Sequence, residues 1–242
     1  MNFEFIWANG VCFAAMHDGS AAGWPLWIAG FVLAALISYV LGSLNFGILI
    51  SKYKYHQDIR QYGSGNAGMT NMLRTYGKGA ALITLLGDAL KAAISVLVVG
   101  HLLVGYRGAY VAGLACIVGH VFPVFYRFKG GKGVVTTAVM ILCLNPVAFA
   151  ILLLCFIIIV AFTKYISMGS IICMLMYPLI EYKTVGAGPN ILISVAVAVF
   201  VIWMHRSNIQ RLRQGTENKF SLKSKKKDSA PASKPDEPHG QA

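Results

Sequence analysis

The sequence predicts an all-α, polytopic membrane protein with about seven transmembrane helices, an N-terminus outside the cell membrane and a cytoplasmic C-terminus. Composition is the first observation: 57% of the 242 residues are hydrophobic, 12% are charged, and mean hydropathy is +0.63. Soluble globular domains carry about 25% charged residues. The second observation is that the basic residues behind the net charge of +12 cluster between long apolar segments and at the C-terminus. Anionic lipid and phosphorylated compounds are therefore the expected partners, and nucleic acid is not.

Seven apolar segments approach the length that a membrane-spanning helix needs, about 20 residues. The fourth is the shortest, and it needs Gly133 or the Asn145-Pro146 turn to help it across. Half insertion of this segment is the alternative. In chain order the segments are Trp24–Ser51, Gly79–Leu103, Ala109–Phe125, Val134–Leu144, Val147–Phe162, Ser167–Ile180 and Ile191–Met204.

The distribution of lysine and arginine predicts the orientation. With the N-terminus outside, the inner loops and tail hold eighteen of these residues, and the outer loops hold only Arg107 and Lys183. Basic residues accumulate on the cytoplasmic side of membrane proteins, and removal of one helix would place basic loops on the wrong face. This orientation brings three polar stretches together on the cytoplasmic side: residues 63–77, 128–133 and 205–212.

The chain is expected to have three parts. Residues 1–23 form an extracytoplasmic extension, and residues 1–22 contain no lysine or arginine, so they lack the basic region of a cleaved signal peptide. Residues 24–220 form a single transmembrane domain. Residues 221–242 are rich in Lys, Ser and Pro and should be a disordered basic cytoplasmic tail. The five cysteines contain no CxxC pair, which predicts buried thiols rather than disulfides or a metal site.

The first polar stretch, GSGNAGMTNMLRTYG at 63–77, has the character of an anion-binding loop. Its glycines free the backbone for close approach to a ligand, and its polar side chains supply hydrogen-bond donors. Such loops suit phosphate. A flexible connector between helices is the alternative, but a connector does not need five hydrogen-bonding side chains. The glycines are Gly63, Gly65 and Gly68, and the polar residues are Ser64, Asn66, Thr70, Asn71 and Arg74.

The second polar stretch, FKGGKG at 128–133, places Lys129 and Lys132 beside Gly130, Gly131 and Gly133. Ammonium groups next to exposed backbone N–H groups bind phosphate well. A P-loop is excluded, because Lys132 is followed by glycine rather than by Ser or Thr. Anchoring by positive charge is the alternative, and it leaves the three glycines unexplained.

The third polar stretch follows the seventh segment. His205 and Asn208 are three residues apart and therefore share a helix face, and basic capping of a helix end explains Arg206 but not Asn208. Ser167 begins the sixth segment on the same side of the membrane, where helix capping is the alternative. His120 lies alone on an apolar helix and is expected to be a hydrogen-bonded structural residue.

Carboxylates are scarce near these stretches. Asp58 and Glu217 stand alone on the cytoplasmic face before the tail, which argues against a two-metal site. No Ser-His-Asp set or GxSxG elbow is visible, so the substrate should already be activated. Asp88 and Lys91 share a face of the second segment, where a structural ion pair and a role in positioning the site are equally open.

The stretches GSGNAGMTNMLRTYG (63–77), GHVFPVFYRFKGGKGVVT (119–136) and HRSNIQRLRQGTENKF (205–220) closely resemble, in this order, the signature motifs of the bacterial acyl-phosphate:glycerol-3-phosphate acyltransferases. The resemblance covers roughly residues 24–220. It implies transfer of a fatty acyl group from acyl phosphate to the 1-hydroxyl of glycerol 3-phosphate, which gives lysophosphatidic acid and phosphate in the first acylation of phospholipid synthesis. It also implies the bacterial cytoplasmic (inner) membrane, a site that faces the cytoplasm, and the soluble enzyme that makes acyl phosphate as a partner.

The resemblance also implies roles for individual residues. An acyl phosphate is a mixed anhydride whose own phosphate can take the acceptor proton, so the protein supplies positioning and charge, and no metal or other cofactor is implied. Asn45 and Ala92 depart from the family pattern, which usually has proline and glycine there. Catalytic roles are implied for Ser64, Arg74, Lys132, His205 and Asn208. Substrate-binding roles are implied for Gly63, Gly65, Asn66, Gly68, Thr70, Asn71, Lys129, Gly130, Gly131 and Ser167.

A membrane transporter for anions or phosphate esters is the alternative function. Transport requires polar groups through the depth of the membrane and often an internal repeat. Here the polar groups gather on one face and no repeat is visible. The same polar motifs make a purely structural membrane adaptor improbable.

Overall fold

The computed structural model describes residues 9–12 and 23–220, and all regular structure within them is helical. The predicted extension and tail fall largely on residues 1–8, 13–22 and 221–242, which lie outside the described residues. The longer helices are α3 (Gly23–Ser43), α6 (Lys78–Ala93), α8 (Tyr106–Val121), α9 (Val134–Leu144), α10 (Pro146–Thr163), α11 (Ile166–Val185) and α12 (Pro189–Met204). The shorter ones are α4 (Phe46–Tyr55), η1 (Ile59–Gln61), α5 (Met69–Tyr76), the π-helix η2 (Ile94–Gly100), α7 (His101–Val104), η3 (Val124–Tyr126) and α13 (Arg206–Arg213).

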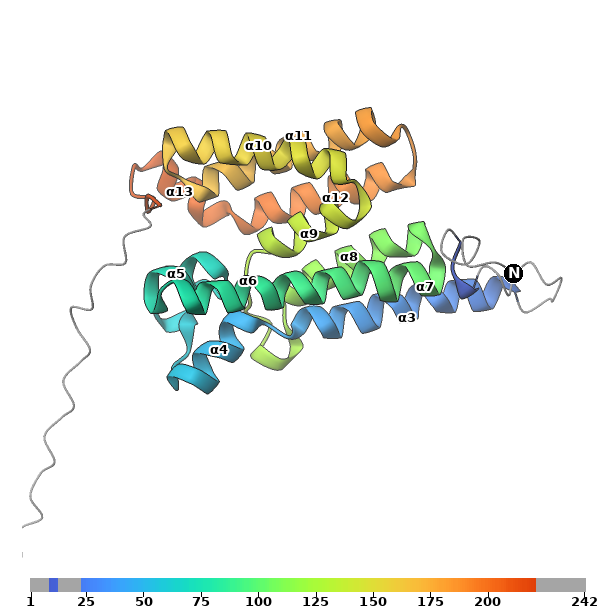
Figure 1. Ribbon diagram of the computed structural model, residues 1–242, viewed down its shortest axis with the longest axis horizontal. Coiled ribbons are helices and arrows are strands. Elements are labelled where there is room, and N and C mark those ends of the chain that lie inside the picture. The colour runs from blue at the N-terminus through green and yellow to red at the C-terminus, as the bar shows by residue number, and fades with distance from the viewer. Residues whose placement is uncertain (1–8, 13–22, 221–242) are drawn as a thin grey trace, which may run out of the picture.

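The helices form two layers. Helices α3, α6 and α8 pack in one layer, α10, α11 and α12 pack in the other, and α9 lies between them (Figure 1). The main core fills this junction with large buried side chains that include Tyr110, Met140 and Tyr177. Helices α5 and α13 lie at one end of the bundle, and α7 lies at the other (Figure 1). The first of these is called the α5–α13 end below.

The helical surface is suited to lipid. Four helical stretches are long and apolar enough to cross a membrane, and a fifth qualifies if α12 and α13 are counted as one bent span. In α10 the side chains of Leu154, Ile157 and Phe162 are exposed at 60%, 54% and 85%. A surface this apolar fits a bilayer, where each helix satisfies its own backbone hydrogen bonds. The predicted all-helical class is confirmed, and a helix occupies each of the seven predicted segments; how many of them cross, and in which direction, stays a prediction.

The first predicted segment is not one continuous helix. The chain leaves the helix after Ser43, and α4 starts at Phe46 and turns away from the bundle (Figure 1). Asn45 causes the restart, because its side-chain oxygen accepts a hydrogen bond from the Ile48 N–H at 3.1 Å and caps α4. The residue that departs from the family pattern is therefore a helix cap.

The third segment also differs from expectation, whereas the fourth has the predicted bounds. Helix α8 ends at Val121 instead of Phe125, because a residue before proline disfavours the helical conformation and Pro123 follows directly. Helix α9 has 11 residues, which rise roughly 16 Å, about half the thickness of the hydrocarbon core. The segment before it folds back along the end of α8, where Gly130 N–H donates to the Val121 carbonyl at 3.0 Å.

A buried carboxylate fixes the opposite end of the bundle. Glu181 of α11 is fully buried and accepts hydrogen bonds from the Tyr110 hydroxyl at 2.5 Å and from Asn145 Nδ2 at 2.8 Å. Asn190 at the start of α12 adds a third donor at 3.3 Å. A buried carboxylate is tolerated when donors surround it. Helices α8, α11 and α12 and the α9–α10 turn therefore meet at one polar point.

Candidate active site

The first glycine-rich loop is wound around the buried side chain of Asn71. Its Oδ1 accepts from the Ser64 N–H at 2.9 Å, and its Nδ2 donates to the carbonyls of Tyr62 and Asn66 at 2.9 and 3.0 Å. Gly63 has a φ of +59°, and a Cβ there would lie 2.2 Å from Asn71 Oδ1. The loop needs glycine at this position because the backbone presses against the amide that holds it. Asn71 thus shapes the loop, with its amide engaged inside the chain.

Three predicted ligands of this loop keep their side chains available. The side chains of Ser64, Asn66 and Thr70 make no hydrogen bond to any residue in the described part of the chain, and Ser64 is exposed. Arg74, one turn along α5, reaches the backbone carbonyl of Asn218 at 3.4 Å. Gly65, which also has a positive φ of 70°, and Gly68, which precedes α5, complete the loop.

The second loop owes its glycines to packing against His120. A Cβ on Gly131 would lie 2.1 Å from His120 Nε2, and one on Gly130 would lie 2.0 Å from the His120 carbonyl. The backbone N–H groups of Gly130 and Gly131 donate to the Val121 and His120 carbonyls at 3.0 and 3.1 Å. These two amides are therefore occupied, and the expectation that they are exposed for phosphate is wrong. The loop is a rigid support for Lys132.

His120 is itself held by the buried charges of α6. Lys91 Nζ lies 2.9 Å from Asp88 Oδ1 and 3.0 Å from His120 Nδ1, and all three side chains are buried. The same ammonium donates to the carbonyls of Gly42 and Leu44, both at 2.8 Å. The predicted ion pair is confirmed. It also secures the break before α4 and, through His120, the second glycine loop.

Replacing Lys91 with methionine is expected to destabilise the fold by about 3–5 kcal/mol, because it removes the ammonium 2.9 Å from the buried Asp88 carboxylate and leaves His120 Nδ1 at 3.5 Å. The loss will appear as a lower thermal midpoint of the purified protein in detergent. Asp88→Asn combined with Lys91→Met removes both charges and should recover part of the loss. A double variant no more stable than Lys91→Met alone would contradict this explanation.

The third stretch and the second loop meet at the α5–α13 end. Lys132 Nζ donates to Asn208 Oδ1, and Asn208 Nδ2 donates to Glu217 Oε1 at 2.7 Å. Ser167 Oγ donates to the same carboxylate oxygen at 2.8 Å, and Arg211 Nε donates to Glu217 Oε2 at 2.7 Å. Three predicted residues, Lys132, Asn208 and Ser167, thus belong to one hydrogen-bonded cluster.

Glu217 is the centre of this cluster, although no role for it was predicted from the sequence. Its position inside the third motif was the available signal, and its partners come from α11 and α13. Burial opposes its negative charge, but hydrogen bonds from Asn208, Ser167 and Arg211 keep the pKa of Glu217 below its usual value. The only carboxylate of the cluster among the described residues is therefore ionised and fully engaged.

The charge balance at Lys132 favours an added anion. Burial, and after it the positive charges of Arg211 and Arg74, lower the pKa of Lys132 to about 8 against the opposing effect of Glu217. A phosphate bound at this point would place a negative charge beside the three cations Lys132, Arg211 and Arg74. Lys129, the other lysine of the loop, is exposed, and its carbonyl rather than its ammonium makes the contact seen here.

His205 has a defined tautomer. Its Nδ1 lies 2.7 Å from the Val201 carbonyl, which can only accept, so Nδ1 carries the proton and Nε2 keeps its lone pair. The side chain is 3% exposed and stands one turn before Asn208. This arrangement gives the site a neutral hydrogen-bond acceptor without a carboxylate partner.

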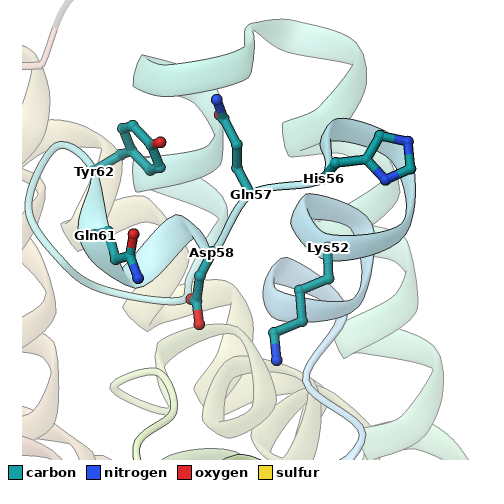
Figure 2. Close-up of a pocket in the computed structure, with 6 residues that line it drawn as sticks. All are labelled: Lys52, His56, Gln57, Asp58, Gln61 and Tyr62. Carbon is teal, nitrogen blue, oxygen red and sulfur yellow. The ribbon is translucent and has the colours of Figure 1, made fainter. Parts of the chain in front are cut away.

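A pocket of about 490 Å³ opens beside the first loop but not at this cluster (Figure 2). None of the predicted site residues lines it. No three His, Cys, Asp or Glu side chains gather as potential metal ligands within residues 9–12 and 23–220. The pocket is lined by Lys52, His56, Gln57, Asp58, Gln61 and Tyr62.

Comparison with known proteins decides the family. The glycerol-3-phosphate acyltransferase profile matches residues 32–215, which include the first two motif regions and residues 205–215 of the third. The chain belongs to this family. The glycerol-3-phosphate acyltransferase of Paraburkholderia phymatum is 38% identical over 198 residues, which cover 80% of this chain and 94% of the relative. That of a Thermoanaerobacter species is 40% identical over 192 residues, with 79% and 96% covered.

Two solved structures support the same assignment. Both are crystal structures of PlsY, an integral membrane glycerol 3-phosphate acyltransferase, in its glycerol 3-phosphate form (TM-score 0.74, 32% identity) and its lysophosphatidic acid form (TM-score 0.72, 31% identity). Each match covers 79% of this chain and 96% of the solved chain. The acyltransferase is therefore an integral membrane enzyme of phospholipid biosynthesis, and the transporter and adaptor alternatives lose their support.

Proposed function

We propose that this acyltransferase moves a fatty acyl group from acyl phosphate to the 1-hydroxyl of glycerol 3-phosphate, giving lysophosphatidic acid and inorganic phosphate. The observation that carries the proposal is the cluster at Lys132, where three cations surround one carboxylate that is already bound by three donors. Such a site holds phosphate groups but offers no carboxylate as general base. An acyl phosphate needs none, because it brings an activated acyl group and a basic phosphate together.

The proposed reaction uses the substrate's own phosphate. The hydroxyl oxygen of glycerol 3-phosphate bonds to the acyl carbonyl carbon, the bond from that carbon to the phosphate oxygen breaks, and the leaving phosphate takes the hydroxyl proton. Lys132 and Arg74 stabilise the negative charge on the phosphates, and Nε2 of His205 accepts the acceptor hydroxyl as a hydrogen-bond donor. Ser64, Asn66 and Thr70 are free to bind the second phosphorylated substrate.

The proposed setting is the bacterial inner membrane, with seven crossings and the α5–α13 end in the cytoplasm. The excess of lysine and arginine in the loops at that end supports this orientation. A cytoplasmic site is open to soluble glycerol 3-phosphate, while the acyl donor arrives in the lipid. The soluble enzyme that makes acyl phosphate is then a natural partner.

A direct assay tests the donor. Purified protein is incubated with glycerol 3-phosphate and either palmitoyl phosphate or palmitoyl-CoA, and lysophosphatidic acid is measured. Product from the phosphate donor and none from the CoA donor is expected. Product from palmitoyl-CoA alone would overturn the proposed donor while leaving the acyltransferase family intact.

The pKa of Lys132 predicts a basic limit to activity. With a pKa of about 8 the ammonium is largely protonated at pH 7 and largely neutral at pH 9, so kcat/KM should fall about tenfold between them. Lys132→Arg stays charged over this range, and its profile should lack that fall. Identical profiles for the two proteins would show that Lys132 is not the titrating group.

A further inference from the structure

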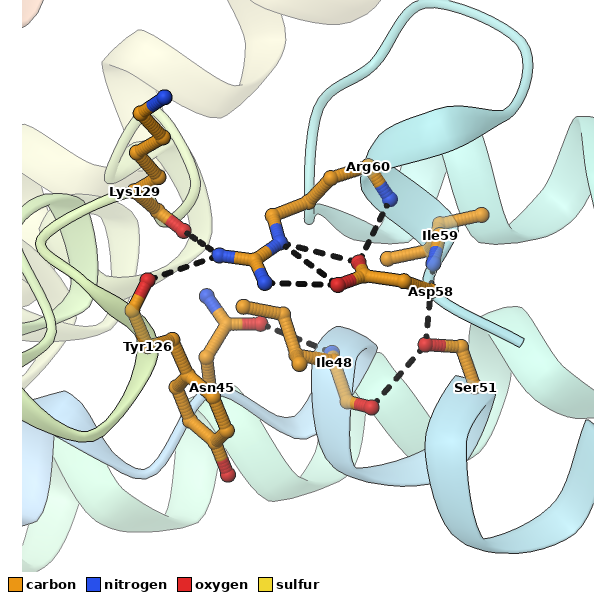
Figure 3. A network of polar contacts seen from close by, with 8 residues as sticks. All are labelled: Asn45, Ile48, Ser51, Asp58, Ile59, Arg60, Tyr126 and Lys129. Atoms are coloured by element: carbon orange, nitrogen blue, oxygen red, sulfur yellow. Dashed lines mark hydrogen bonds and ion pairs between the residues drawn. The ribbon is translucent and has the colours of Figure 1, made fainter. Parts of the chain in front are cut away.

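Arg60 joins the two glycine-rich loops, although it belongs to neither (Figure 3). Its Nη1 donates to the carbonyl of Tyr126 at 2.8 Å, just before the second loop, and to that of Lys129 at 3.0 Å, within it. Its Nε and Nη2 contact the Asp58 carboxylate at 2.9 and 2.6 Å, just before the first loop. One guanidinium therefore bridges segments that lie 66 and 69 residues apart in the chain.

The turn that Arg60 bridges is strained. Arg127 and Phe128 are consecutive and both have a φ of 57°, a left-handed conformation that costs a residue other than glycine about 1–2 kcal/mol. Such strain persists only where the surroundings impose it. The two carbonyls that Arg60 binds flank this pair, and the Phe128 N–H donates to the Pro123 carbonyl at 3.0 Å. The guanidinium thus braces the turn that leads directly into Gly130.

The other end of the bridge is equally fixed. Asp58 Oδ1 accepts from the Arg60 N–H at 3.0 Å and caps η1, and the hydrogen bonds from Arg60 hold the pKa of the Asp58 carboxyl below its usual value. Ile59, which lies between Asp58 and Arg60 in the sequence, is fully buried, and its carbonyl accepts a hydrogen bond from Asn71 Nδ2 at 3.3 Å. Asn71 is the residue around which the first loop is wound. The guanidinium of Arg60 is therefore connected to the first loop through Asp58, Ile59 and Asn71.

We propose that Arg60, aligned by Asp58, is a positioning residue that sets the distance between the two glycine-rich loops. The inference rests on the proposed function, in which the loops bind two phosphorylated substrates. A fixed spacing between loops fixes the distance between acceptor hydroxyl and acyl carbonyl, and a misplacement of about 1 Å costs about 10²-fold in rate. Loss of the bridge will therefore lower kcat more than it weakens the binding of either substrate.

Arg60→Lys is the variant that tests this role, with Arg127→Lys as its matched control. A lysine ammonium keeps the charge but cannot bind a carboxylate in a fork and two carbonyls at once. Arg127 is exposed and makes no hydrogen bond or ion pair with the described residues. Arg60→Lys is expected to lose at least about tenfold in kcat, with KM for glycerol 3-phosphate and palmitoyl phosphate within about threefold of wild type, and Arg127→Lys should match wild type.

A distance measurement makes the test independent of catalysis. Spin labels on the exposed residues Gln61 of η1 and Phe125 of η3, in a background without the native cysteines, report the separation of the two segments that lead into the loops. We expect a broader distance distribution in Arg60→Lys than in wild type or Arg127→Lys. An unchanged distribution would overturn the inference even if no variant transferred acyl groups, whereas a wild type inactive with palmitoyl phosphate would overturn only the proposed donor.

Two kinetic results also count against the inference. If Arg60→Lys has the same kcat as Arg127→Lys, the bridge does not set a loop distance that matters for catalysis. If instead KM for one substrate rises tenfold while kcat is unchanged, Arg60 contacts that substrate directly. Should Arg60→Lys not fold, Asp58→Asn decides, because it keeps the cap acceptor of η1 but removes the charge that aligns the guanidinium. A lower kcat and a broader distribution are expected, and wild-type behaviour in both would overturn the inference.

Discussion

Replacing Lys132 or Arg74 with alanine is expected to lower kcat/KM for acyl transfer by about 10²–10³, because each variant removes a charge from the cluster that we propose binds phosphate. Neither side chain fills the apolar core, so both variants should be extracted and purified as folded protein. Within the described part of the chain, Lys132 makes one side-chain hydrogen bond, to Asn208, and Arg74 makes one long hydrogen bond, to the Asn218 carbonyl. The substitutions should therefore lower the rate of acyl transfer without destabilising the fold, and the thermal midpoint should change little.

Arg213→Ala is the matched control for these variants. It removes one positive charge from α13 at the same end of the protein, but its side chain is exposed and makes no hydrogen bond or ion pair with the described residues. Wild-type kinetics are expected. Turnover by Lys132→Ala or Arg74→Ala at the level of this control would sink the roles assigned to them.

Gly131→Ala is expected to be strongly damaging for a change of one methyl group. The new Cβ would lie 2.1 Å from His120 Nε2, and the ring cannot easily move because its Nδ1 contacts the buried Lys91. The loop must shift instead, so a cost of about 1–3 kcal/mol in stability is expected from overpacking. Because the adjacent Lys132 shifts with it, kcat/KM is expected to fall about 10²-fold.

Two further variants separate the clash from other effects of adding a methyl group. Gly79→Ala places the same group in α6 where no atom lies within 4 Å, and it should stabilise by about 0.5–1 kcal/mol. His120→Ala in the Gly131→Ala background removes the colliding ring, so the double variant should lose less activity than the sum of the single losses. Additive losses would show that the ring is not the obstacle.

The helices were predictable because a membrane imposes one length and one composition on them. The second segment was expected from Gly79 to Leu103, and the structure has Lys78–Val104. The break after Ser43 was not predictable, because the polar Asn45 sits in an otherwise apolar run and the carbonyls freed there bind Lys91, 47 residues from Leu44. The local sequence pattern indicates whether a helix is surrounded by lipid or by water, but it does not identify the distant residues that contact the helix.

The meeting of Lys132 with Asn208 and Ser167 was anticipated from motif order and side of the membrane. The reason for the glycines before Lys132 was not, because it depends on the ring of His120 pressing on them from α8. Glu217 and Arg60 were missed for the same reason: each contacts segments that only the folded chain brings near. Their residue types alone are common on any cytoplasmic loop.

Helix α10 offers a different kind of consequence. Only 11% of its apolar stretch is buried inside the protein, so most of its side chains meet lipid and no specific neighbour. Lipid tails disfavour charged side chains, but they accommodate aliphatic side chains of different shapes almost equally well. The order of Leu, Ile, Val and Phe along the outer face of α10 is therefore only weakly constrained. One apolar residue can replace another there, so long as no charged residue is introduced. That freedom ends where α10 contacts the core, at the buried Ala148 and Leu152 and at the partly buried Phe149, Cys155 and Phe156.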